Sequence, residues 1–122
     1  GVQLDLMGQE NAESTGTRQL SGVGGQMDFL EGAYRSKGGK GFICINSSRV
    51  TKDGERKSNI LATIPGGSTI SAPRTMIQYV ATEYGIASLS GKTLRERAEA
   101  MASIAHPDFR EELMKYAQEN FK

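Results

Sequence analysis

The chain of 122 residues contains no tryptophan, a single histidine, a single cysteine and three prolines. One cysteine cannot form an internal disulfide, and one histidine with one cysteine excludes a His/Cys zinc site, so we predict no metal. Lys and Arg number 15 against 14 Asp and Glu, for a formal net charge of +1. Nucleic-acid and membrane-surface partners need a clustered positive field, so this balance argues against both. No apolar run approaches the roughly 18 residues of a membrane span.

Glycine, by contrast, is abundant, at 15 of the 122 residues. Glycine normally makes up about 7% of a soluble domain. Seven of the glycines lie between Gly22 and Gly41. Such a concentration is expected where the backbone must approach another group closely or adopt positive φ.

The hydrophobic pattern predicts an α/β chain. Val2, Leu4 and Leu6 alternate with polar residues, which is typical of a half-buried strand. The continuous apolar run 42–45 instead suits a strand buried on both faces, as in a parallel sheet, and we expect its Cys44 to be buried. The sequence between them, at residues 8–17, is polar and predicts a loop or a short pair of strands.

Turn formers divide the middle of the chain into short segments. Lys52-Asp53-Gly54 signals a hairpin turn. Strands are expected at residues 59–64, 69–70 and 86–89, and residues 76–84 fit either a strand or a helix.

The last third of the chain predicts two helices. Thr93 and Glu96 have the spacing of a capping box, and Pro107 suits the first position of a second helix. The expected buried stripe of the first helix comprises Leu94, Ala98, Met101, Ala102 and Ala105. That of the second comprises Phe109, Leu113, Tyr116 and Ala117.

The strongest candidate site is the glycine cluster Gly22, Gly24 and Gly25, which precedes a short predicted helix beginning near Gln26. Uncovered amides at the positive end of a helix bind phosphate or stabilise an oxyanion. The alternative is a tight turn with close helix–strand packing. Neither a P-loop nor a Rossmann fingerprint is present. Lys37 and Lys40 lie on a glycine loop further on, and they either contact a phosphate-rich ligand or are solvated.

Other chemically capable side chains are few. Glu83 lies among apolar residues and a glycine, where a carboxylate is either paired or functional. His106 precedes a proline between two predicted helices, a position that favours a capping or packing role over that of a general base.

Six segments of the chain form a recognisable series: SGVGGQMDF (21–29), SKGGK (36–40), PR (73–74), YVATEYGIA (79–87), GKTLRERA (91–98) and IAHPDFR (104–110). In their order and approximate spacing they resemble the acetyl-CoA hydrolase/transferase family, and within it 4-hydroxybutyrate and butyryl-CoA:acetate CoA-transferases. The resemblance covers essentially the whole chain.

The resemblance implies part of a CoA-transferase-like (NagB/RpiA-like) α/β domain, with a central, mostly parallel sheet and two C-terminal helices. It implies that residues 1–122 are the C-terminal portion of a longer two-domain cytoplasmic enzyme that forms a homodimer. The opening within a predicted strand agrees with a fragment whose neighbouring strands lie upstream.

The resemblance also implies a chemistry: ping-pong CoA transfer through a glutamyl-CoA thioester, with acyl-CoA and a small carboxylic acid as substrates and no permanent cofactor. Gly24 and Gly25 match the family's oxyanion loop, and Gly22, Gln26, Lys37 and Lys40 are expected CoA contacts. The nucleophilic glutamate is expected upstream of Gly1, so the segment alone is expected to be inactive. Glu83 is interpreted as an anchor of the domain or a border of the acyl pocket.

Three alternatives stay open at this point. Water could replace the acceptor acid, which would make the enzyme an acetyl-CoA hydrolase. The chain could be a stand-alone phosphate- or nucleotide-binding module. It could also be a structural domain without a site.

Overall fold

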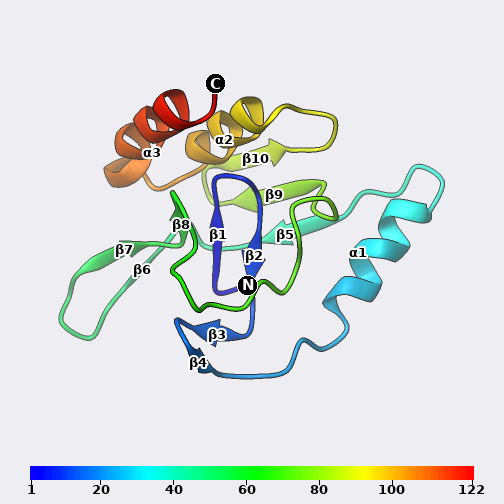
Figure 1. The fold of residues 1–122 in the computed structure, drawn as a ribbon, viewed down its shortest axis with the longest axis horizontal. Coiled ribbons are helices and arrows are strands. Elements are labelled where there is room, and N and C mark those ends of the chain that lie inside the picture. The colour runs from blue at the N-terminus through cyan, green and yellow to red at the C-terminus, as the bar shows by residue number, and fades with distance from the viewer.

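The computed structural model describes residues 1–122 and shows a mixed α/β domain of short strands and three helices (Figure 1). In chain order the elements are β1 (Gln3–Asp5), β2 (Glu10–Asn11), β3 (Ser14–Thr15), β4 (Arg18–Gln19), α1 (Gln26–Arg35), β5 (Phe42–Cys44), β6 (Ser48–Val50), β7 (Arg56–Ser58), β8 (Ile60–Leu61), β9 (Tyr79–Thr82), β10 (Gly85–Ser88), α2 (Leu94–Ser103) and α3 (Pro107–Asn120).

The strands form two small mixed sheets and two separate hairpins. One sheet has the order β2-β1-β8 and the other β10-β9-β5, and each contains one antiparallel and one parallel pairing. The hairpins are β3–β4 and β6–β7. The expected single, mostly parallel sheet is therefore not confirmed. Tight turns join β9 to β10 and β6 to β7, and such turns can connect only antiparallel strands.

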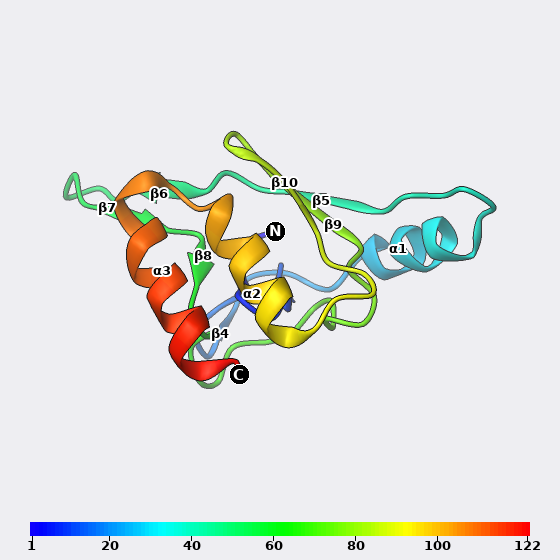
Figure 2. The same ribbon diagram turned by 90° about the horizontal axis from the view of Figure 1, so that it is seen from above.

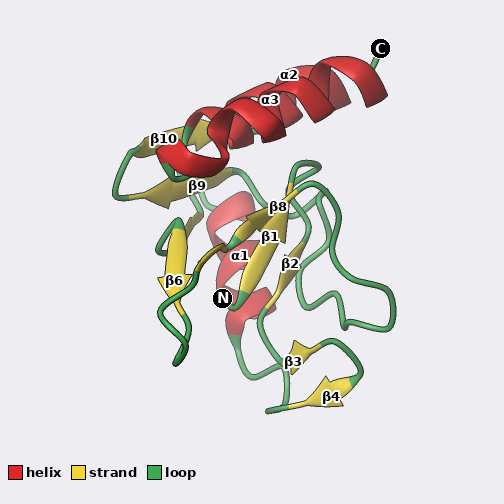
Figure 3. Ribbon diagram, turned by 90° about the vertical axis from the view of Figure 1, so that its left-hand side faces the viewer, coloured by secondary structure: helices red, strands yellow, loops and turns green.

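The helices are distributed unevenly around the sheets. Helices α2 and α3 lie side by side and α2 packs against β10, while α1 lies at the opposite end of the molecule (Figures 1 and 2). Figure 3 shows the same helix pair forming a layer above the β2-β1-β8 sheet. The core lies between these layers. Its fully buried larger side chains are Leu4, Leu6, Ile60, Ile77, Val80, Leu89 and Met101. No helix has both the length and the apolar character needed to cross a membrane.

Local signals for the two C-terminal helices are confirmed. The Thr93 hydroxyl accepts from the Glu96 amide, and the Glu96 carboxylate accepts from the Thr93 amide at 2.8 Å, which completes the capping box. Pro107 occupies the first turn of α3, and the His106 ring accepts from the Asp108 amide at 3.1 Å. His106 is therefore a helix cap, as its position suggested. Leu94, expected in the buried stripe, is 40% exposed.

The apolar run 42–45 is paired as predicted but buried differently. Strand β5 pairs in parallel with β9, yet only Ile43 is buried, whereas Phe42 and Cys44 are exposed. The reason is that successive side chains of a strand point to opposite faces of the sheet, and only the face that carries Ile43 meets the core. The expectation that Cys44 is buried is wrong.

Two further predictions overestimated the extent of strand. Only Ile60–Leu61 of the segment 59–64 is strand. Residues 69–70 form no strand, and the nearest pairing is an isolated bridge between Ala72 and Glu10.

Arg97 joins three distant segments of the chain. Its side chain, in a residue only 7% exposed, donates to the carbonyl oxygens of Met7, Leu89 and Arg74 at 2.9, 2.9 and 2.7 Å. Burial lowers the pKa of this guanidinium from its usual value, with the charge of Arg74 acting in the same direction. Neighbouring Gly8, at φ +88°, leaves room for the guanidinium, because a Cβ there would lie 2.7 Å from Arg97 Nη2.

Candidate functional site

The glycine loop, residues 21–25, connects β4 to α1 and carries free amides. Gly24 has φ +62°, and Gly25 is the N-cap of α1 without any side-chain cap. The amides of residues 22–28 donate to no acceptor within the protein, and all three loop glycines are exposed. The loop therefore presents a row of unpaired donors at the positive end of a ten-residue helix.

Close packing does not explain these glycines. A Cβ at Gly22 or Gly24 would meet open space, and one at Gly25 would only touch Phe29 at an ordinary 3.9 Å. Only Gly24 has a conformation that favours glycine. The tight-packing alternative therefore has no support at Gly22 and Gly25, where the absence of a side chain keeps the amides accessible.

The loop is held at both ends. At its start the Ser21 amide donates to the Glu13 carbonyl at 3.1 Å, and Gln19 Nε2 donates to the Ser21 carbonyl at 2.7 Å. At its end the Gln26 side chain donates to the carboxyl of Glu10. Fixed ends with free amides between them are what preorganised binding of a negatively charged oxygen requires.

The two lysines follow α1 in the chain, on a loop that turns back beside the helix. Lys37 and Lys40 are both exposed and follow the helix, whose ten residues correspond to a length of about 15 Å. Lys40 and Gln26 line the same hollow of about 350 Å³ between α1 and β5, with Phe29, Leu30, Ala33, Gly41, Phe42 and Ile43. Lys37 does not line it, so the structure brings only Lys40 to the hollow that Gln26 shares.

Glu83 lies in the β9–β10 turn beside a second hollow. Its Oε1 accepts from the Ser47 amide at 2.7 Å, so the carboxylate ties this turn to the segment after β5. The hollow is lined by Gly1, Cys44, Ile45, Asn46, Asn59, Ala81, Thr82 and Glu83. It lies at the carboxyl ends of the parallel strands β5 and β9, where α/β sheets commonly bind ligands.

Glu83 gives the domain a pH-dependent contact. Slight burial raises the pKa of its carboxyl, but hydrogen bonds from Ser47 outweigh this and lower it below the usual value. A pKa that is lower in the folded than in the unfolded state adds stability at pH values above the unfolded-state pKa of 4.5. This stability disappears as the pH falls through the folded-state pKa.

We therefore expect Glu83→Gln to be less stable than wild type at pH 7, with the difference shrinking below about pH 4.5. Urea unfolding at both pH values measures it, and a pH-independent difference would contradict the assignment.

No metal centre is present among the side chains. No group of three or more His, Cys, Asp and Glu residues is arranged to hold an ion. His106 is occupied as the cap of α3, and its ring lies 5.8 Å from that of Tyr84 in an edge arrangement.

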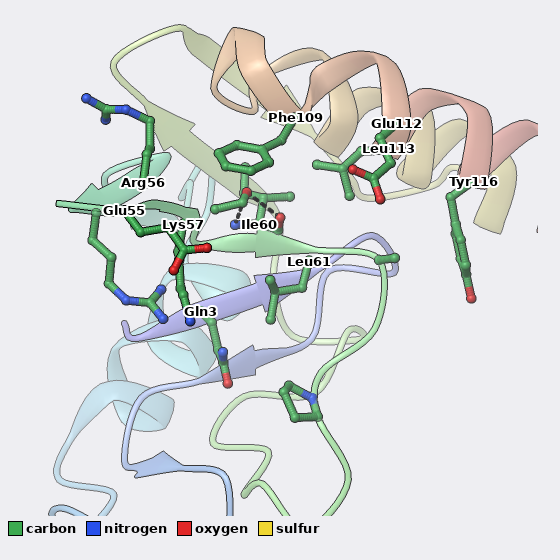
Figure 4. Close-up of a pocket in the computed structure, with 14 residues that line it drawn as sticks. Gln3, Glu55, Arg56, Lys57, Ile60, Leu61, Phe109, Glu112, Leu113 and Tyr116 are labelled. Atoms are coloured by element: carbon green, nitrogen blue, oxygen red, sulfur yellow. Dashed lines mark hydrogen bonds between the residues drawn. The ribbon is translucent and has the colours of Figure 1, made fainter. Parts of the chain in front are cut away.

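A separate cavity of about 430 Å³ lies between the β6–β7 hairpin, β8 and α3 (Figure 4). Its wall combines apolar residues such as Ile60, Phe109 and Leu113 with the charged Arg56 and Lys57. The Ser58 hydroxyl donates to the Ile60 carbonyl at 2.5 Å and accepts from the Ile60 amide, which covers the outer edge of β8. None of the residues predicted from the sequence as a site lines this cavity.

Sequence reasoning missed the polar layer beneath the glycine loop. Residues 8–17 were predicted to form a loop or a short pair of strands, and they contain the short strands β2 and β3, but the burial of Glu10, Asn11, Glu13 and Ser14 was not predicted. Asn11 Oδ1 accepts from the amides of Glu13 and Ser14 at 3.1 and 3.0 Å. The only signal in the sequence was the local Asn11 to Ser14 spacing, which is typical of an Asx turn and carries no information about burial.

The chain is similar to known CoA-transferases. It is 49% identical to butyryl-CoA:acetate CoA-transferase of Anaerostipes caccae over 96% of this chain and 26% of that protein. It is 50% identical to 4-hydroxybutyrate coenzyme A transferase of Clostridium kluyveri over 98% of this chain and 27% of that protein. Its fold matches the crystal structure of RipA from Yersinia pestis with a TM-score of 0.82 and 40% identity, over 97% of this chain and 26% of that one.

The chain thus spans about a quarter of the length of the relatives it matches. Residues 1–117 match the family described as the acetyl-CoA hydrolase/transferase C-terminal domain. The glycine loop, the lysine loop and the Glu83 turn all lie within that match. The chain belongs to the acetyl-CoA hydrolase/transferase family and corresponds to its C-terminal domain.

Proposed function

We propose that this chain is the C-terminal segment of an acyl-CoA:carboxylate CoA-transferase of the butyrate/acetate or 4-hydroxybutyrate type. The observation that carries the proposal is the row of free amides at residues 22–28, which runs from the glycine loop into the first turn of α1, while both ends of the loop are anchored. The names and about 50% identity of the transferase relatives support the reaction type. The complete enzyme is proposed to be a cytoplasmic homodimer.

The proposed reaction is a ping-pong exchange. A glutamate supplied by the upstream sequence attacks the thioester carbonyl. The CoA thiolate is expelled, and an acyl-glutamyl anhydride forms. The thiolate then attacks the glutamyl carbonyl, which releases the first carboxylate and leaves a glutamyl-CoA thioester. An incoming carboxylate reverses both steps and takes the CoA. Each attack creates a tetrahedral oxyanion, and we assign its stabilisation to the amides of Gly24 and Gly25.

The arrangement around α1 suits a long substrate. Acyl-CoA carries its thioester and its phosphates at opposite ends of the pantetheine arm. Gly22 and Gln26 lie at the start of α1, a helix of about 15 Å, Lys37 follows its last turn, and Lys40 lines the hollow beside the helix that Gln26 also lines. We propose that the first pair contacts the thioester side and that the lysines contact the phosphates as point charges. No permanently bound cofactor is required.

The test uses the complete protein that contains this chain. Incubation with butyryl-CoA and isotope-labelled acetate is expected to give labelled acetyl-CoA, and borohydride reduction is expected to trap a modified glutamate upstream of Gly1. CoA release that is unaffected by acetate would instead indicate the acetyl-CoA hydrolase alternative. Trapping at Glu83 would overturn its assignment here. Binding of CoA without any turnover would indicate a binding module and would refute the proposal.

A further inference from the structure

Glu10 carries a carboxyl group that is completely enclosed by the domain. Its side chain is 0% exposed. Its backbone is fixed by pairing with Leu4 of β1 and by bonds to Ala72, whose carbonyl accepts from the Glu10 amide at 3.0 Å. The backbone of Glu10 is therefore held in strand β2, and its side chain points into the interior.

The two oxygens of this carboxyl have unequal surroundings. Oε1 accepts a hydrogen bond from Gln26 Nε2. Oε2 has no hydrogen-bond partner. Burial raises the pKa of Glu10, and the hydrogen bond from Gln26 opposes this effect. A neutral carboxyl is the form that a buried oxygen without a partner tolerates best.

The bond to Gln26 is important because little else holds α1. Gln26 is the first residue of α1 and follows the glycine loop directly. Leu30 is the only buried residue of this helix, and Phe29 is 83% exposed. The Glu10–Gln26 bond therefore links the end of the glycine loop to the β2-β1-β8 sheet.

We propose that Glu10 is a positioning residue for CoA transfer: by accepting from Gln26 through Oε1, it fixes the glycine-loop amides relative to the reacting thioester. The inference rests on the proposed function and adds a residue to it. Glu10 itself is enclosed and touches no substrate. Its contribution is therefore made through Gln26 and the first turn of α1.

The test compares Glu10→Leu, which removes the acceptor, with Glu10→Gln, which keeps a carbonyl acceptor for Gln26. In the complete enzyme, Glu10→Leu is expected to lower kcat by about 10- to 100-fold, since a misplacement of about 1 Å can cost 10²-fold. The loss should fall mainly on kcat, because the oxyanion forms only in the transition state, and KM for acyl-CoA should rise less, through the contact assigned to Gln26. Glu10→Gln should stay within about 3-fold of wild type because its carbonyl preserves the hydrogen bond.

A double variant tests the route through Gln26. If Glu10 acts through Gln26 alone, Glu10→Leu/Gln26→Leu will be no slower than Gln26→Leu. The control is Leu113→Ala, which removes a buried core side chain of α3, a helix far from α1 (Figure 2), and should lower the melting temperature without lowering kcat. Should Glu10→Leu fail to fold, Glu10→Asp replaces it, since the shorter side chain withdraws the carboxyl from Gln26.

The outcomes separate the two proposals. No transfer by the wild-type enzyme refutes the proposed function. If the wild-type enzyme is active, three results would each refute only the positioning role. These are an unchanged kcat in Glu10→Leu, a kcat of Glu10→Gln as low as that of Glu10→Leu, and kcat losses that multiply in the double variant.

Discussion

Replacement of Gly25 by valine is expected to lower kcat for CoA transfer by about 10²–10³-fold, the usual loss when one oxyanion donor is removed. The branched side chain would cover the free amides next to the N-cap of α1. The change should not unfold the domain, because Gly25 has φ −97° and a Cβ there meets only Phe29 at 3.9 Å. The loss should therefore concern catalysis and not stability.

Steady-state kinetics with butyryl-CoA and acetate, together with the melting temperature, measures this effect. The matched control is Gly66→Val, because Gly66 is another exposed glycine whose Cβ position is open and which lies outside the glycine loop. The control should retain wild-type kcat. A Gly25→Val enzyme with unchanged kcat would exclude the loop from oxyanion stabilisation.

Replacement of Arg97 by methionine is expected to lower the free energy of unfolding by about 3–5 kcal/mol. Methionine fills much of the volume but donates nothing to the carbonyls of Met7, Leu89 and Arg74, which then lose their partner in the interior. Lysine at this position should restore only part of the loss. Its compact ammonium lacks the planar fork with which arginine reaches several acceptors.

Urea unfolding followed by circular dichroism gives the magnitude. Arg95→Met on the same helix is the control, since Arg95 is half exposed and forms a surface ion pair with Glu99 at 3.0 Å. Such i,i+4 pairs contribute only about 0.3–0.5 kcal/mol. If Arg97→Met were no less stable than Arg95→Met, the three hydrogen bonds of Arg97 to backbone carbonyls would not contribute to the stability of the domain.

Local patterns in the sequence predicted the elements whose causes are local. The capping box of Thr93 and Glu96, the start of α3 at Pro107 and the turn between β6 and β7 all involve residues within a few positions of one another. The helix after the glycine loop was predicted for the same reason. These features follow from backbone hydrogen bonding and φ preferences that a short window contains.

Burial could not be predicted in the same way, because it depends on partners that are distant in sequence. Arg97 and its acceptor Met7 are separated by 90 positions, and nothing near either residue indicates the contact. Cys44 lies in an apolar run, yet it is exposed because it points to the face of β5 that does not meet the core. Hydrophobic patterning predicts which segments become strands, but a continuous apolar run does not show which faces of the sheet are covered.

The candidate site shows the same division. The exposed glycines were identified from their spacing before a helix, which is a local feature. The anchor of the loop was missed, because Glu10 precedes Gln26 by 16 residues and reaches it only through the fold. A buried carboxyl in a polar segment has no recognisable pattern in a single sequence.

The sparse packing of α1 affects how the domain can vary. A helix with one buried side chain belongs to the part of a protein that opens at low free energy, independently of the cooperative unit formed by α2, α3 and the sheets. Substitutions on its exposed face therefore have little influence on global folding. Changes on the exposed face of α1 can therefore accumulate while the stability set by the rest of the domain is left untouched.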